Sequence, residues 1–263
     1  MNNKGSSEDL KTSPTGSLAS ERRHRWLLDR LRTDSSMSLT AAAASLGVSE
    51  MTVRRDFDHL ESLGVARRVR GGAVYGSPVS FEGRERTHAT EKRRIAEKLL
   101  PLVPTNGLIA VDSSTTMHRL AQMMVGAGDL TVVTNGLLTF QALQERPGLT
   151  AILTGGIADR RSDSLVGPVA AATLDGLRFS NFFSSAAALD ASGCYEDTLD
   201  EASIKRAFAR SSARVTVGVN SQKLAHAATA ASFDLAAISK LVTELDPSDD
   251  ALDGFREAVL EIA

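Results

Sequence analysis

The sequence predicts a two-domain α/β protein, in which a small helical domain with a β-hairpin precedes a larger, mostly parallel αβα domain. Apolar residues recur at helical spacing in three short segments before residue 64, and a glycine pair then separates two β-like runs. From residue 91 onward, helical segments alternate with apolar runs, a pattern that is typical of βαβ units. The length of 263 residues also fits two domains, since a domain takes roughly 100–200 residues.

Apolar spacing and capping residues predict the three helices of the first domain. The first helix lies in ERRHRWLLDRLR and ends near Asp34. The second follows Thr40 as its N-cap and ends at Gly47, a C-cap residue. The third follows Ser49 as its N-cap and runs to Gly64. Its apolar residues share one face, which we expect to be buried: Val53, Phe57, Leu60 and Leu63.

A hairpin is predicted next, because two β-like runs, 65–70 and 73–75, flank Gly71 and Gly72. Two helices joined by a tight turn and followed by a hairpin form a winged helix-turn-helix, whose second helix enters the major groove of DNA. We therefore expect a disordered tail over 1–20 and this domain over 21–76. The stretch 77–90, rich in Gly, Ser, Pro and charge, is predicted as a linker to the second domain over 91–263.

Outward-facing residues of the third helix and the hairpin are the candidate DNA-reading residues. Arginine side chains suit guanine edges and phosphates, and hydroxyls suit phosphates. Residues 21–77 hold ten Arg and seven acidic residues, a net charge of +3 within a chain of net charge -2. Solvated surface arginines are the alternative, disfavoured because two arginine groups fall where the geometry places DNA. The candidates are Ser49, Thr52, Arg54, Arg55, Arg67, Arg68 and Arg70.

This segment closely resembles the helix-turn-helix and wing of the DeoR family of bacterial regulators. The resemblance is carried by LGVSEMTVRRDFDHLESLGVARRVRGGA, in which SE-x-T-x-RRD, LE-x-x-G and RRV-x-GGA recur at fixed spacing. It implies a transcriptional regulator that binds a duplex DNA operator. We expect such a protein in the cytoplasm, and at the nucleoid when it is bound to DNA.

Three strand ends of the second domain carry small polar residues, in the strings DSSTT, TNG and TGG. In an open α/β sheet such ends line the ligand crevice, and the first string also begins a helix, whose N-terminus attracts anions. Helix capping explains any one turn alone, but three turns in phase favour a ligand pocket. The predicted pocket residues are Asp112, Ser113, Ser114, Thr115, Thr116, Thr134, Asn135, Gly136, Gly155 and Gly156.

The second domain is similar to the C-terminal sensor domain of the same family. The matching pieces are EKRRIA, DSSTT, VVTNG, TGG, LVG, EASIKRAF and NSQK. The similarity implies a fold like that of ribose-5-phosphate isomerase and a phosphorylated sugar or related metabolite as effector. It adds Gly167, Glu201, Lys205 and Lys223 to the effector-binding residues, with the two lysines as partners of phosphate or sugar oxygens.

The expected function is a regulator, in the first place a repressor of a sugar catabolic operon, controlled by that effector. The alternative is an isomerase-like enzyme with an accessory DNA-binding domain, but no pocket carboxylate stands in a recognisable catalytic string, so no catalytic residue is assigned. A weaker alternative is an architectural DNA-binding protein. Two departures from the family pattern, at Ser114 and Asn220, leave the identity of the effector open.

Composition excludes several other classes. With 42% hydrophobic and 24% charged residues, the chain matches globular proteins. One cysteine, Cys194, excludes an internal disulfide and a zinc site built on several thiolates. No run of about 20 apolar residues could span a bilayer. We expect no cofactor, no metal and no membrane partner, and a homo-oligomer that pairs two DNA-binding domains across two half-sites.

Overall fold

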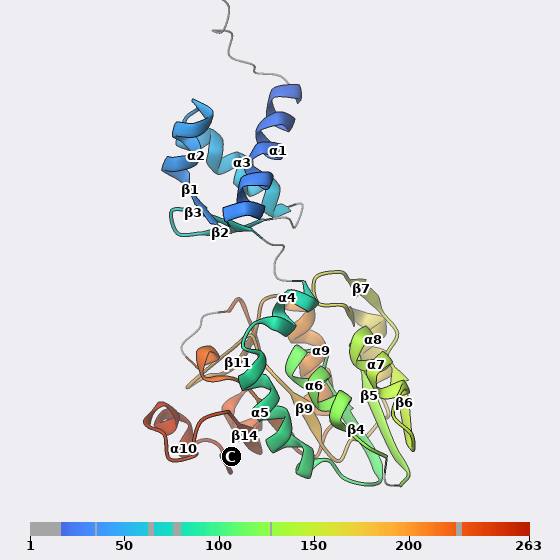
Figure 1. Cartoon of the computed structure of the whole chain (residues 1–263). Coiled ribbons are helices and arrows are strands. Elements are labelled where there is room, and N and C mark those ends of the chain that lie inside the picture. Colours follow the sequence, from blue (N-terminus) through green and yellow to red (C-terminus); the bar gives the residue numbers. More distant parts are fainter. Residues whose placement is uncertain (1–16, 35, 63–65, 76–79, 127, 225–227) are drawn as a thin grey trace, which may run out of the picture. The chain divides into compact units, whose positions relative to one another are not determined.

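The chain divides into two compact units, Met1–Ser80 and Phe81–Ala263, each described by itself (Figure 1). The computed structural model describes residues 17–34, 36–62, 66–75, 80–126, 128–224 and 228–263. Residues 1–16 of the predicted tail, residues 63–65 and Gly76 of the predicted first domain, and residues 77–79 of the predicted linker lie outside the described residues.

Among its described residues, the first unit has three helices and a three-stranded antiparallel sheet of order β1-β3-β2. Its elements are α1 (Ser17–Asp34), β1 (Ser36–Ser38), α2 (Leu39–Leu46), α3 (Glu50–Ser62), β2 (Ala66–Val69) and β3 (Gly72–Tyr75). The predicted apolar face of α3 is buried, with Val53 and Phe57 both fully enclosed against Leu27 and Leu31 of α1. Apolar burial of this kind is the main stabilising contribution to so small a unit.

Two local features of the first unit differ from the prediction, the N-cap of α2 and the start of α1. Helix α2 is capped by Ser38, whose Oγ accepts a hydrogen bond from the Ala41 amide at 3.1 Å, and not by Thr40. Thr40 Oγ1 instead donates to Glu50 Oε1 at 2.7 Å. Helix α1 begins at Ser17, so residues 17–20 are helical and not part of a tail. Gly47 ends α2 with φ at 64°, as predicted, because glycine tolerates the left-handed conformation.

The second unit is built on a six-stranded parallel sheet of order β14-β12-β9-β4-β5-β6. The predicted alternation of helices and strands is confirmed. The sheet strands are β4 (Gly107–Val111), β5 (Leu130–Thr134), β6 (Leu149–Leu153), β9 (Phe182–Ser184), β12 (Val215–Gly218) and β14 (Lys240–Val242). The main helices are α5 (Ala89–Leu99), α6 (Thr115–Met123), α7 (Leu137–Gln144), α8 (Pro168–Thr173) and α9 (Leu199–Arg210).

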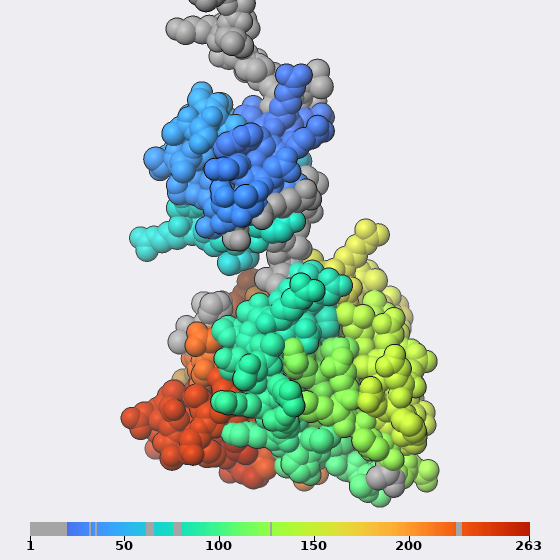
Figure 2. Space-filling model, viewed as in Figure 1, coloured from blue at the N-terminus to red at the C-terminus, as the bar shows by residue number. Residues whose placement is uncertain are grey.

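Two separate apolar cores show that helices cover both faces of this sheet. Alternate residues of β4 point to opposite faces, as the period of a strand requires. Ile109 packs with α5 and α6, and Ala110 packs with α8 and α9. Figure 2 shows the teal and green side chains of α4 to α6 covering one face. The αβα architecture is therefore confirmed.

Residues 81–90, predicted as part of the linker, instead begin the second unit. Helix α4 (Phe81–Arg86) is held there by Phe81, which is 3% exposed and meets the His118 ring edge-on at 5.1 Å between centroids. A single buried aromatic residue, Phe81, does not produce the repeated apolar spacing from which a helix is predicted. The sequence therefore did not indicate this helix.

The chain end also differs from the prediction. The sequence LDGFREAVLEIA predicts a terminal helix over 252–263, but within this stretch the structure has only the short helix α10 (Asp253–Arg256), after a 3-10 turn over Asp250–Leu252. The last residues pair with β14, where the Leu241 amide donates to the Glu261 carbonyl at 2.9 Å. No helix of the described residues is long and apolar enough to cross a membrane.

Five short strands were not predicted. They are β7 (Ile157–Asp159) paired with β8 (Ser164–Val166), and β10 (Ala188–Asp190), β11 (Gly193–Glu196) and β13 (Ala230–Asp234) in an antiparallel sheet. Strands of three to five residues carry too few alternations for a period of two to stand out.

Candidate functional site

The predicted DNA readers on α3 are exposed and available to a partner. Arg54 and Arg55 are both exposed, and neither side chain forms an ion pair with another described residue. Ser49 caps α3, since its Oγ accepts from the Thr52 amide at 3.2 Å and lies 2.9 Å from Thr52 Oγ1. The two hydroxyls therefore fix the start of α3, and the arginines carry the free positive charge.

The hairpin arginines differ from one another. Arg67 and Arg70 are exposed. Arg68 is half-buried, and its guanidinium pairs with Asp58 and donates to the Arg54 carbonyl at 3.4 Å. Arg68 therefore joins the hairpin to α3, whereas Arg67 and Arg70 form no ion pair with another residue that the structure describes.

Asp56, not singled out from the sequence, joins α1 to α3. It is 4% exposed, and its carboxylate accepts from Arg23 Nε at 2.8 Å and Nη2 at 3.0 Å. His24 Nε2 lies 2.9 Å from the same carboxylate. Burial raises the pKa of Asp56, but the hydrogen bonds and charges of Arg23 and His24 outweigh it and hold the pKa below its usual value. In the sequence, an acidic residue next to two arginines is typical of an exposed surface. The sequence therefore did not indicate the buried role of Asp56.

We expect acid to destabilise the first unit through Asp56. A carboxylate with a folded-state pKa below its unfolded value of about 3.9 stabilises the fold above that pH, and the stabilisation disappears as the pH falls through the folded-state pKa. Asp56→Asn should remove this acid-dependent step and lower stability at neutral pH. Fluorescence of Trp26, the single tryptophan, follows unfolding of this unit. Asp34→Asn, at an exposed ion pair, is the control that keeps the step. An unchanged acid transition in Asp56→Asn would contradict the assignment.

In the second unit, Asp112 organises the carboxyl ends of β4 and β9. It is fully buried, and Oδ2 accepts from Ser184 Oγ and from the Ser185 amide, both at 2.8 Å. Oδ1 accepts from the Ser114 amide at 2.8 Å. Burial raises the pKa of Asp112, but the charge of Lys205 and these hydrogen bonds hold it below its usual value. Asp112 is therefore an ionised anchor for two loops.

Lys205 of α9 neutralises this anchor. Its Nζ lies 3.1 Å from Asp112 Oδ2 and donates to Glu196 Oε1 and to the Ser185 carbonyl, both at 2.8 Å. Burial lowers the pKa of Lys205, but the neighbouring carboxylates more than offset this and hold it above its usual value. Two of the three donors of this ammonium are used in hydrogen bonds, and its charge is paired with Asp112 and Glu196.

Lys223 and Lys92 are cations without such neutralisation. Lys223 Nζ donates to Ser185 Oγ at 3.2 Å and to the Ala186 carbonyl, and burial together with the charge of Lys205 lowers its pKa to about 8. Lys92, 4% exposed, donates to the Arg84 carbonyl, and burial with the nearby charge of Lys223 lowers its pKa to about 7. Neither ammonium forms an ion pair with a carboxylate of the described residues. The sequence did not reveal Lys92, because a lysine in an amphipathic helix reads as a surface charge.

Glu201 and Arg84 belong to the same group of neighbouring charged residues, which we call the charged cluster. Its members are Arg84, Lys92, Asp112, Glu196, Glu201, Lys205 and Lys223. Glu201 accepts from Ser164 Oγ, and Ser113 Oγ lies 3.5 Å from its Oε2. Arg84 of α4 donates to the carbonyls of Arg161 at 2.8 Å and Ser162 at 3.4 Å. Burial lowers the pKa of Arg84, which the charge of Glu201 partly opposes.

Some predicted pocket residues gather with this cluster. The Asp112 and Thr134 turns pack closely, since a Cβ at Gly136 would lie 2.8 Å from the Ser113 Cα. Buried oxygens of Asn135, Thr154 and Asn220 have no hydrogen-bond partner among the described residues. Unsatisfied buried oxygens of this kind indicate unfilled hydrogen-bonding capacity.

Other predicted pocket residues have local structural roles. Ser114 caps α6, with Oγ accepting from the Met117 amide at 3.3 Å. A Cβ at Gly155 would meet Val169 of α8 at 3.1 Å, and one at Gly156 would lie 2.9 Å from the Ala170 Cβ. Gly167 precedes α8 with φ at 88°, a conformation that favours glycine. These three glycines therefore serve the packing of α8, and their role in effector binding stays a prediction.

Comparison with known sequences decides the family. The sequence model of the DeoR C terminal sensor domain matches residues 87–245, and that of the DeoR-like helix-turn-helix domain matches residues 23–79. The chain belongs to the DeoR family. This DeoR-family protein is a DNA-binding transcriptional regulator and not an enzyme, as the sequence predicted.

Curated relatives of this DeoR-family protein are named as regulators. It is 29% identical, over 100% of its chain and 98% of the relative, to a "Putative aga operon transcriptional repressor" of Escherichia coli O157:H7. It is 29% identical to the L-fucose operon activator of Haemophilus influenzae, over 81% and 87% of the two chains. It is 35% identical to the lactose phosphotransferase system repressor of Staphylococcus aureus, over 60% and 65%.

Similarity to solved structures is weaker. Ribose 5 phosphate isomerase A from Neisseria gonorrhoeae aligns with a TM-score of 0.36 and 15% identity, over 51% of this chain and 52% of that one. The delta subunit of eIF2B from Chaetomium thermophilum aligns at 0.44 and 11%, over 87% and 72%. These scores carry no argument about function.

Within the described residues of this DeoR-family protein, no group of three or more His, Cys, Asp or Glu side chains is arranged to hold a metal ion. The charged cluster at the carboxyl ends of the sheet instead combines carboxylates with lysines. Such a set offers cationic donors to an anion more readily than ligands to a metal, since metal ions favour carboxylate, imidazole and thiolate ligands.

Proposed function

We propose that this DeoR-family protein represses a sugar catabolic operon and that a phosphorylated sugar, or a related metabolite, controls its DNA binding. The effector anion binds at the cationic cluster formed by Lys92, Lys223 and Arg84. The observation that supports this proposal is the ammonium of Lys92, which is 4% exposed, forms no ion pair with a carboxylate of the described residues, and has a pKa lowered by burial and by the charge of Lys223. The printed names of relatives, which refer to aga, fucose and lactose systems, support a sugar operon.

Charge balance favours an anionic ligand over a neutral one. Lys205 pairs with Asp112 and Glu196, and burial raises the pKa of Glu196 to about 7, which reduces the negative charge left beside this ammonium. Lys92 and Lys223 form no ion pair with a carboxylate of the described residues, and burial lowers the pKa of both. Burying unpaired charges costs free energy, which a bound phosphate recovers by pairing with both. The open hydrogen-bonding capacity of Asn135, Thr154 and Asn220 suits the hydroxyl groups of a sugar.

DNA binding and effector binding must be coupled for control. An effector changes operator affinity only if it binds the DNA-competent and the DNA-free conformations with different affinity. We propose that the protein acts as a homo-oligomer, in the cytoplasm and at the nucleoid when bound to DNA, with paired first units on two half-sites.

A ligand panel on the full-length chain tests the proposal. Hexose and pentose phosphates, the same sugars without phosphate, and inorganic phosphate are compared by thermal unfolding, because a ligand that binds only the native state raises its stability. A stabilising sugar phosphate should also lower affinity for an operator selected from random duplexes. Lys223→Gln and Lys92→Gln should lose the stabilisation, whereas Lys240→Gln, paired with Glu261 elsewhere, should keep it. If no phosphorylated sugar stabilises more than its unphosphorylated form, the proposed effector class is wrong.

We expect anion binding to weaken as the pH rises from about 7 to about 9. The pKa values of Lys92 and Lys223 in the free protein are about 7 and about 8, so both lose charge in this range. An anion binds the protonated forms, and the affinity therefore falls by up to about tenfold per pH unit for each proton taken up. Titration calorimetry in buffers of different ionisation enthalpy measures the affinity and the proton uptake together. An affinity that stays constant over this range would contradict the assignment of these lysines.

A further inference from the structure

Helix α8 presents an exposed apolar ridge on the second unit. Val169 is 61% exposed, and Ile157 of β7 is 68% exposed. The two lie on one continuous surface, because a Cβ at Gly155 would touch Val169 and one at Gly167 would lie 3.5 Å from Ile157 Cδ1. Exposed apolar ridges of this kind mark sites of interaction when they adjoin a complementary surface.

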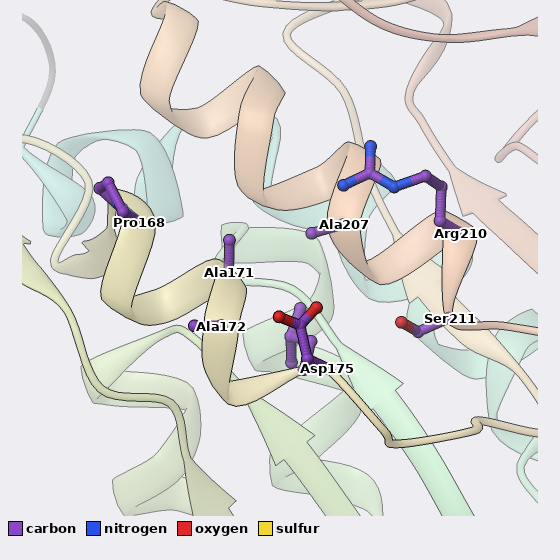
Figure 3. A pocket seen from close by; sticks show the side chains of 8 residues that line it. Pro168, Ala171, Ala172, Asp175, Ala207, Arg210 and Ser211 are labelled. Atoms are coloured by element: carbon purple, nitrogen blue, oxygen red, sulfur yellow. The ribbon is translucent and has the colours of Figure 1, made fainter.

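A hollow of about 300 Å³ adjoins this ridge, between α8 and the end of α9 (Figure 3). Five apolar residues line part of it: Pro168, Ala171, Ala172, Leu174 and Ala207. Its polar lining residues are Asp175, in the turn after α8, and Arg210 and Ser211, at the end of α9. Asp175 and Arg210 are both exposed. Neither forms an ion pair with any residue that the structure describes.

The neighbouring sheet edge is open as well. Strand β6 ends the six-stranded sheet, and β5 is its one partner strand among the described residues. Ile152 on β6 is 39% exposed. An edge strand with unpaired backbone groups is a template for association with another chain. Because β6 leads into Gly155, which contacts α8, this edge continues the same surface.

We propose that this surface is the interface between two copies of the chain. We call it the α8 face and define it by Ile157, Pro168, Val169, Ala172, Asp175 and Arg210. A two-fold interface must be self-complementary, since each copy presents the same patch. The α8 face meets this condition in shape, with a ridge beside a hollow, and in charge, with one unpaired acid and one unpaired base. Asp175 of each copy then pairs with Arg210 of the other.

A second copy fits this surface better than a small ligand does. The hollow carries an exposed acid, Asp175, and an exposed base, Arg210, and a second copy of the chain supplies the opposite charge to both at once. The β6 edge extends the contact toward the roughly 800 Å² per partner that stable complexes bury. The interface lies wholly within the second unit, and its existence does not depend on which effector binds.

Sedimentation velocity on the full-length protein tests the α8 face. Asp175→Arg and Arg210→Asp should each weaken dimerisation at least tenfold, because each places like charges opposite one another. The double variant exchanges the charges and should restore the dimer. Val169→Glu should also weaken dimerisation at least tenfold, whereas Leu260→Glu, at an 89% exposed site near the β14 edge, should not. Circular dichroism confirms that each variant is folded.

Three results would overturn the proposal. The first is a wild-type chain that remains monomeric at about 100 μM. The second is an oligomer that persists unchanged in Asp175→Arg, Arg210→Asp and Val169→Glu. The third is a charge-exchanged double variant that dimerises no better than either single variant, which would exclude the Asp175 to Arg210 pairing across the two-fold axis.

Discussion

Lys205→Met should lower the free energy of unfolding of the second unit by about 3–5 kcal/mol, the usual cost of leaving a buried charge without its partner. Lys205 is 3% exposed and lies within 3.1 Å of Asp112 and 2.8 Å of Glu196. Methionine keeps much of the side-chain volume but supplies no charge and no donor. Asp112 and the Ser185 carbonyl would then lose a partner in a site without solvent.

Urea unfolding measures this loss, with far-UV circular dichroism following mainly the larger second unit. Trp26 fluorescence follows the first unit in the same sample and should not change. Arg93→Met is the matched control, since the exposed Arg93 to Glu97 pair contributes less than about 1 kcal/mol. A loss below about 1 kcal/mol in Lys205→Met would mean that the buried network does not hold the two strand ends together.

Arg55→Ala should weaken operator binding by about 10- to 100-fold, because a bidentate arginine contact to guanine contributes roughly 1–3 kcal/mol. Arg55 is exposed on α3 and has no ion-pair partner among the described residues, so its loss leaves the fold of the first unit intact. Stabilisation by the effector should stay at the wild-type level, since Arg55 belongs to the other unit.

Fluorescence anisotropy at several salt concentrations measures this effect and separates two kinds of contact. The slope of log affinity against log salt falls by about 0.9 if Arg55 neutralises a phosphate and stays unchanged if it reads a base. Arg30→Ala, an exposed cation of α1 paired with Asp34, is the control and should change affinity less than threefold. Equal loss of operator binding and of effector stabilisation would show that Arg55 has a structural role.

Long periodic segments were predictable from sequence, and elements held by single contacts were not. The buried face of α3 and the alternation from β4 to β6 follow directly from apolar spacing. Helix α4 is held by Phe81 and by single polar contacts of Arg84 and Glu85, and the extended chain end is held by backbone pairing with β14. Neither type of contact leaves a periodic pattern.

The position of the candidate site could be predicted from the sequence, but the pairing of its charged side chains could not. The strings DSSTT and TNG lie at neighbouring strand ends, as expected of a parallel sheet. The sequence does not show which lysine pairs with carboxylates, because Lys205 and Lys223 both lie in polar segments. Only the fold shows that Lys205 faces two carboxylates and that Lys92, from a distant helix, joins Lys223.

The pairing of residues 261–263 with β14 covers the outer edge of that strand. Residues 261–263 occupy the outer edge of β14 through the amide of Leu241 and the amides of Thr243 and Ala263. A shortened chain would uncover that edge, and an uncovered parallel edge invites strand-to-strand aggregation between molecules.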